Sequence, residues 1–126
     1  MAVSEELVEH VREQLAGLGP VAIRGMFGGA GVYCRGVMFA LLAGDLLYFK
    51  ADDQNRPDFE AAGLGPFMYE AKGGRKVSLG YYEAPSDVFD DADEMVKWAR
   101  KALDAALRAR ANQPPTRRAR TVSRRR

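Results

Sequence analysis

The spacing of apolar residues divides the chain into helical and extended segments. Leucine and valine recur every three or four residues between Ser4 and Leu18, which is typical of an amphipathic helix. A second helical pattern follows the acidic stretch 91–94 and continues to Ala106. Ser4 and Asp91 precede these patterns and are favourable N-caps, because their side-chain oxygens accept hydrogen bonds from the first free backbone N–H groups. We therefore expect a helix near each end of the folded region.

The segments between these helices are short and apolar, as in the strands of a sheet. A glycine-rich strand is expected at 21–33, and its glycines predict a bend or bulge because glycine reaches positive φ without steric cost. Further strands are expected at 37–42, 46–50, 67–70 and 76–82. Their short connections favour antiparallel neighbours, since a parallel pair needs a crossover of about a dozen residues or more.

One more helix is expected at 57–62, where proline lies in the first turn and Gly63 ends the pattern. The element order is then α-β(3)-α-β(2)-α, which predicts a two-layer α+β fold with an antiparallel five-stranded sheet. In the last strand Val77, Leu79 and Tyr81 alternate with mostly polar or small residues, so we expect this face to be buried.

Charge is distributed unevenly along the 126 residues. Residues 1–107 hold 11 basic and 17 acidic side chains, a net charge of −6, whereas residues 108–126 hold eight arginines and no acid. We expect one folded domain at 1–111 and a disordered arginine-rich tail at 112–126, because the tail has too few apolar residues to form a core. Such a tail either binds nucleic acid through its phosphates, without reading the bases, or only improves solubility. Its arginines are Arg117, Arg118, Arg120, Arg124, Arg125 and Arg126.

Few side chains in the sequence carry reactive chemistry. His10 and Cys34 are each the only residue of their type, which excludes an intrachain disulfide and a cysteine metal cluster. The glycine-rich segment lacks both the P-loop pattern and the dinucleotide-binding pattern. The acids at 87–94 lack the order of a calcium loop, and their place before a helix explains them as capping residues. We therefore expect a non-enzymatic protein with no catalytic, cofactor-binding or metal-binding residue.

The expected hairpin at 67–82 mixes tyrosines with basic residues, a combination that can stack single-stranded bases. Ordinary packing is the alternative, because strand tyrosines are often half-buried with the hydroxyl in water. The residues concerned are Tyr69, Lys72, Arg75, Lys76, Tyr81 and Tyr82.

Localisation is expected to be cytoplasmic. No run approaches the roughly 18 apolar residues that cross a bilayer, and the first residues are acidic where a signal peptide is basic. A single cysteine also fits a reducing compartment.

A motif in the glycine-rich segment resembles the opening motif of the TfoX (Sxy) N-terminal domain family, known from bacterial regulators of competence. The motif residues are Arg24, Met26, Phe27, Gly28, Gly29, Gly31 and Tyr33. Further matches are Met38-Phe39-Ala40, Leu47-Tyr48-Phe49-Lys50, Arg56-Pro57-x-Phe59, Pro66-Phe67-x-Tyr69 and Tyr81-Tyr82-Glu83-x-Pro85. Together they cover about residues 8 to 107.

The resemblance implies an α+β fold like that of secretion chaperones and a role in transcription regulation alongside the cyclic-AMP receptor protein. Full-length regulators of this family continue into a helical C-terminal domain, so this chain is expected to be a single-domain member without it. We expect a small interaction module that docks another protein and is a monomer or homodimer. The alternative is a nucleic-acid-associated protein that binds through its arginine-rich tail.

Overall fold

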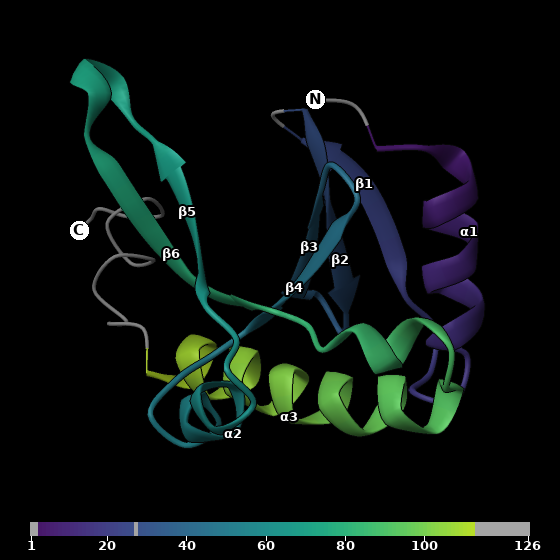
Figure 1. Ribbon diagram of the computed structural model, residues 1–126. Coiled ribbons are helices and arrows are strands. Elements are labelled where there is room, and N and C mark those ends of the chain that lie inside the picture. The colour runs from purple at the N-terminus through teal and green to yellow at the C-terminus, as the bar shows by residue number, and fades with distance from the viewer. Residues whose placement is uncertain (1–2, 27, 113–126) are drawn as a thin grey trace, which may run out of the picture.

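The computed structural model describes residues 3–26 and 28–112, which form an antiparallel sheet with helices packed on one of its faces (Figure 1). The helices are α1 (Glu5–Gln14), α2 (Arg56–Ala61) and α3 (Ala92–Ala111), with single 3₁₀ turns at Lys72–Gly74 and Ser86–Phe89. The strands are β1 (Ala22–Met26), β2 (Gly29–Cys34), β3 (Val37–Ala43), β4 (Leu46–Lys50), β5 (Pro66–Glu70) and β6 (Lys76–Glu83). The predicted α+β class is confirmed.

The glycine-rich segment predicted to be one bent strand is instead a hairpin of two. β1 and β2 pair in antiparallel register from Ala22 opposite Tyr33 to Met26 opposite Gly29, and Gly28 lies in the turn with a φ of 78°. The prediction of five strands was therefore wrong, and the order is α-β(4)-α-β(2)-α. Glycine's access to positive φ serves a bend and a turn equally, so the sequence pattern alone did not distinguish them.

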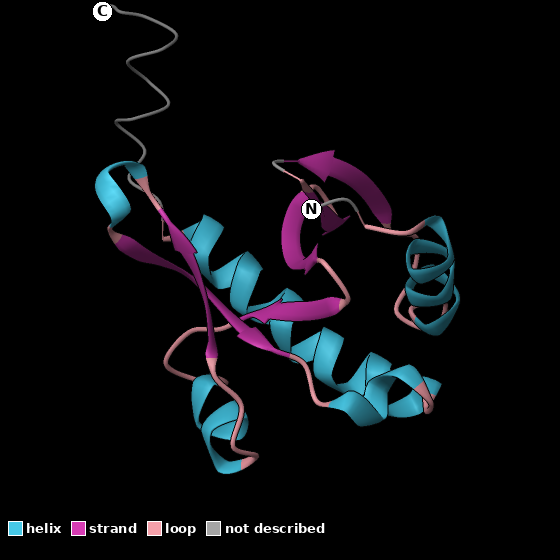
Figure 2. Cartoon of the chain, turned by 45° about the horizontal axis from the view of Figure 1, so that its top comes forward, coloured by secondary structure: helices cyan, strands magenta, loops and turns pink. Residues whose placement is uncertain are grey.

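The strand order in the sheet is β1-β2-β3-β4-β6-β5, and all five neighbouring pairs are antiparallel. α2 lies in the connection from β4 to β5, and β6 returns between these two strands. Figure 2, with the top of the molecule forward, shows α3 crossing behind the strands.

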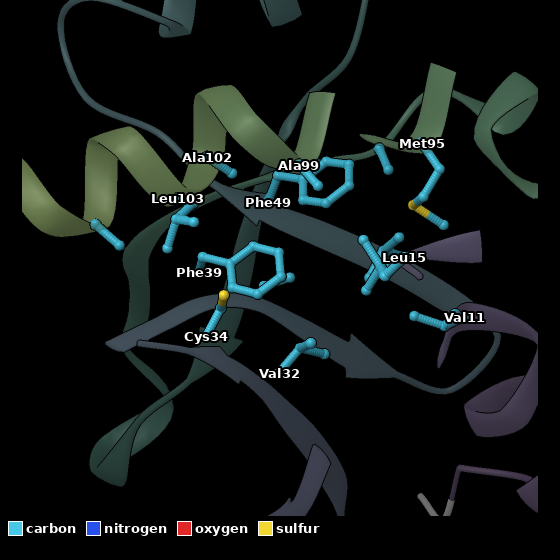
Figure 3. Close-up of a cluster of buried hydrophobic side chains, with 14 of the residues drawn as sticks. Val11, Leu15, Val32, Cys34, Phe39, Phe49, Met95, Ala99, Ala102 and Leu103 are labelled. Atoms are coloured by element: carbon cyan, nitrogen blue, oxygen red, sulfur yellow. The ribbon is translucent and has the colours of Figure 1, made fainter. Parts of the chain in front are cut away.

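The hydrophobic core lies between the sheet and the helices. α3 packs against β3 and β4, and α1 packs against one end of α3. Figure 3 shows the aromatic rings of Phe39 and Phe49 between α3 and Val32 of β2. Phe39 and Phe49 are fully buried, as are Val11 and Leu15 from the first helical region. Apolar residues of α3 close the core on its helical side: Met95, Ala99, Ala102, Leu103 and Ala106.

Both predicted helix caps are present. The Ser4 hydroxyl accepts a hydrogen bond from the backbone N–H of Leu7, and the Asp91 carboxylate accepts bonds from Asp93 and Glu94. These bonds satisfy donors that have no partner within the helix. The first helix ends at Gln14, earlier than predicted, and a turn continues the chain to Leu18.

The β5–β6 hairpin diverges from the other strands (Figure 1). Within β6, only Tyr81–Glu83 pairs with β4, whereas Lys76–Ser78 pairs with β5 alone. Gly80, with a φ of 78°, lies between the two paired stretches and redirects β6. The sheet therefore has two arms, one formed by β1–β4 and one by the β5–β6 hairpin.

None of the helices in the described part of the chain has both the length and the hydropathy needed to span a bilayer.

Candidate interaction site

An apolar groove of about 490 Å³ lies between the two arms of the sheet. One wall comes from Phe67, Tyr69 and Leu79 of the β5–β6 hairpin, and the other from Met26 and Leu41 of the β1–β4 arm. Leu41, although buried, is not part of the core beneath α3. We call this site the inter-arm groove; it borders the main core, since Ala30 and Leu42 of its lining belong to the core cluster.

Residues with small side chains line the end of the groove at the β1–β2 and β3–β4 turns. They are Gly28, Gly29, Ala30, Ala43 and Gly44. Because glycine and alanine fill little volume, they leave space beside the longer side chains of both walls. Three motif residues thus take part in the groove, namely Gly28, Gly29 and Met26.

Several large apolar residues of this region stay exposed to solvent. Tyr69 and Leu79 in the groove are 42% and 39% exposed, and Met68 and Leu46 nearby are 46% and 40% exposed. The predicted buried face of the last strand was therefore wrong at Leu79, whereas Tyr81 is buried as expected. Exposed apolar residues that line a hollow are typical of a surface that binds a partner.

The remaining motif residues pack together beside the groove. A Cβ atom at Gly31 would lie 2.7 Å from Sδ of Met38 and 3.1 Å from Sδ of Met26, so these side chains cover the glycine backbone. The Arg24 guanidinium lies 5.7 Å from the centre of the Tyr33 ring, in a cation–π contact. Phe27 lies outside the described residues.

Tyr81 anchors β6 to the other arm of the sheet. Its hydroxyl donates to the Met38 carbonyl at 3.2 Å, and Lys50 Nζ lies 5.3 Å from its ring centre. Burial, with a smaller contribution from neighbouring Tyr33, raises the pKa of Tyr81 to about 12. Tyr81 therefore stays neutral near pH 7 and has a structural role.

The hypothesis of a basic aromatic face on the hairpin was wrong, because its tyrosines lie in different places. Tyr69 lines the groove and Tyr81 is buried. Tyr82 points to the helical side, where its ring stacks on Phe59 at 5.5 Å. No continuous platform for bases is formed by these three rings.

The residues considered for catalysis have structural surroundings. Nε2 of His10 lies 2.6 Å from the Phe89 carbonyl oxygen and joins α1 to the turn before α3. Cys34 is buried in the core. Within residues 3–26 and 28–112, no three side chains of His, Cys, Asp or Glu are grouped in a way that could hold a metal.

The tail arginines Arg117, Arg118, Arg120, Arg124, Arg125 and Arg126 lie outside the described residues. Arg108 and Arg110, which begin the basic part of the sequence, belong to α3. Arg108 donates to Asp52 through Nε at 2.7 Å and through Nη2 at 2.9 Å. It is therefore engaged within the fold.

Comparison with known proteins agrees with the motif. Residues 13–106 match the TfoX N-terminal domain. This chain belongs to the TfoX N-terminal domain family. It is 26% identical over 107 residues to Protein Sxy of Escherichia coli strain K12, an alignment that covers 85% of this chain and 51% of Sxy. The chain thus spans about half the length of this curated relative, and the family resemblance predicted from the motif is confirmed.

Sequence reasoning identified the family motif and missed the inter-arm groove. Leu79 was predicted to be buried, and Gly28 and Gly29 were placed within one bent strand rather than at a turn. A usable signal was the coincidence of small residues at two neighbouring turns, which leaves room for a hollow between strands.

Proposed function

We propose that this protein is a regulatory interaction module that binds an apolar segment of a partner protein in the inter-arm groove. The observation that carries the proposal is the groove itself, a hollow of about 490 Å³ whose large apolar residues remain partly exposed. Removing apolar surface from water contributes about 25 cal/mol for each Å², and the entropic cost of association offsets part of this gain. An amphipathic helix is a suitable occupant, since its apolar side chains fit a groove at helical spacing.

The lining of the groove favours binding over catalysis. Among the described residues that form it there is no carboxylate, imidazole, thiol or amine, and the one polar side-chain group is the hydroxyl of Tyr69. General acid–base and nucleophilic catalysis both rely on such groups close to a substrate. A non-enzymatic role is therefore part of the proposal.

Family membership supports a role in gene regulation. The TfoX N-terminal domain family is known from bacterial competence regulators, and the chain aligns with half of Sxy. We propose transcription control, including competence, as the biological context. The cyclic-AMP receptor protein is the first partner to test.

The test compares two variants of the same hairpin for binding to purified cyclic-AMP receptor protein by isothermal titration calorimetry. Leu79→Asp places a charge in the groove and should weaken binding at least about tenfold, because an aspartate loses hydration when it is covered without a partner. Met68→Asp is the control, since Met68 is similarly exposed and does not line the groove.

Equal binding by both variants and the unchanged chain would contradict docking in the groove. Absence of binding by the unchanged chain would exclude this receptor as the partner. A competence-promoter reporter in cells that lack their own copy of the gene then tests the role itself. Leu79→Asp should lower its output and Met68→Asp should not.

A further inference from the structure

A second hollow, of about 460 Å³, has a basic lining in contrast to the inter-arm groove. It lies between the segment that leads into β1 and the turn that joins β2 to β3. Arg24 and Arg35 line it together with Tyr33 and Gly36. We call it the basic hollow, and both of its arginines are exposed.

Arg35 occupies an unusual backbone position. The two central residues of the β2–β3 turn, Arg35 and Gly36, have φ values of 55° and 79°, as a type I′ turn requires. Such turns favour Asn-Gly, and Arg35 is the one non-glycine residue with positive φ in the described part of the chain. An arginine held where asparagine fits the backbone better points to a use for its guanidinium.

A third guanidinium approaches the same turn from α3. A Cβ atom at Gly36 would lie 3.4 Å from Nη1 of Arg110, so the end of α3 lies against this turn. Within the described residues, Arg24, Arg35 and Arg110 have no carboxylate within ion-pair distance, whereas Arg12, Arg56 and Arg108 each have at least one. Three guanidinium groups are thus gathered around one hollow without an internal counter-charge.

We propose that the basic hollow binds phosphate groups of a nucleic-acid backbone. Guanidinium groups offer paired N–H donors that match two phosphate oxygens, which makes arginine well suited to this contact. A nucleic acid supplies phosphates in a row, one for each roughly 3.4 Å of helix axis on each strand, and therefore reaches several arginines at once. The sequence also continues from the end of α3 into six more arginines, at 117–126. This surface is separate from the inter-arm groove, so either proposal can fail alone.

The experiment measures binding of the full chain to a short fluorescein-labelled DNA duplex by anisotropy, over a series from roughly 50 to 200 mM salt. The key variant combines Arg35→Asn with Arg110→Gln. Asparagine is preferred in a type I′ turn, so the variant keeps its fold while losing two charges. The slope of log affinity against log salt should become shallower by about 1.8, since each phosphate contact contributes about 0.9.

A matched control removes two positive charges elsewhere, through Arg75→Gln with Arg100→Gln. Both residues are exposed and lie outside the lining of the basic hollow. A loss of slope in the key variant that exceeds the loss in the control supports the proposal. Equal slopes in the two variants would overturn the proposal, because binding would then depend on net charge or on the tail and not on the basic hollow.

Competition distinguishes nucleic acid from other phosphate sources. Inorganic phosphate and a phosphoserine peptide, titrated into the complex, should displace the duplex only at concentrations far above that of the DNA. Displacement by the phosphopeptide at concentrations equal to those of DNA would overturn the choice of nucleic acid in favour of a phosphorylated protein.

Discussion

At Gly29 the backbones of β2 and β3 approach so closely that a side chain has no space. A Cβ atom added there would lie 2.3 Å from the Leu42 carbonyl oxygen, which belongs to the backbone and cannot move aside cheaply. Gly31, two residues on, is crowded by flexible side chains instead. A side chain added at Gly29 would therefore clash with rigid backbone, whereas one added at Gly31 would clash with side chains that can move.

Gly29→Ala should destabilise the protein by about 3 kcal/mol, the upper end of the usual cost of overpacking. Urea unfolding followed by circular dichroism measures this free energy. The control is Gly25→Ala in β1, where the added Cβ would have its nearest contact at 4.0 Å and φ is not positive. A loss at Gly25 as large as that at Gly29 would contradict the steric explanation.

At the scale of elements, an ion pair joins the loop after β4 to α3. The two hydrogen bonds from Arg108 lower the pKa of Asp52 from 3.8 to about 2, helped by backbone N–H groups of Gln54 and Asn55. Asn55 is buried and completes the loop, since it accepts from Asp52 N and donates to the Lys50 carbonyl. This loop leads into α2. The ring of Phe59 in α2 packs against the Trp98 ring of α3, with 5.1 Å between the ring centres.

Asp52→Asn should reduce the acid dependence of stability. The pKa of Asp52 is lower in the folded protein than in the unfolded chain, so the pair stabilises the fold above about pH 4 and loses this effect as pH falls to about 2. The loss in the wild-type chain should be about 1–2 kcal/mol, after allowance for solvent screening of the partly exposed pair.

Thermal unfolding at a series of pH values from neutral to about 2 measures this change. The Asn side chain can still accept the loop hydrogen bonds, so the variant mainly loses the charge. Asp45→Asn, at an exposed turn position away from Arg108, is the control and should keep the wild-type profile. If the stability of all three proteins falls equally with pH, the Asp52–Arg108 pair does not account for the loss of stability in acid.

At the scale of the whole molecule, the helices cover one face of the sheet. The inter-arm groove lies between the two arms of the sheet and is not covered by the helices. The β5–β6 hairpin pairs with the other arm only through Tyr81–Glu83, and the rings of Tyr48 and Phe67 also meet edge to face with their centres 4.8 Å apart. Most residues of β5 are exposed, whereas most of β3 is buried. The two arms should therefore differ in local stability.

Hydrogen exchange followed by mass spectrometry should show this difference. Amides of β5 and of Lys76–Ser78 should exchange well before those of β3, which lies between two paired strands and beneath α3. Binding of a partner in the inter-arm groove should slow exchange in the hairpin. Uniform protection across both arms would contradict a weakly held hairpin.

Much of the element order could be predicted from local pattern. The caps at Ser4 and Asp91 act within three residues, and the continuous apolar run around Phe39 indicates a buried strand. The two strands of the β1–β2 hairpin escaped prediction because a glycine turn and a glycine bend look alike in sequence. The exposure of Leu79 was also not predicted, since it depends on how far β6 diverges from β4.

The sequence by itself determined the α+β class, the two capped helices and the family, because these depend on residues close together in the chain and on a motif read residue by residue. Only the tertiary structure decided which apolar residues stay exposed and which arginines gather without acids. Both outcomes depend on distant contacts: the bend at Gly80 separates Leu79 from the β1–β4 arm, and the packing of α3 brings Arg110 to the turn at Gly36.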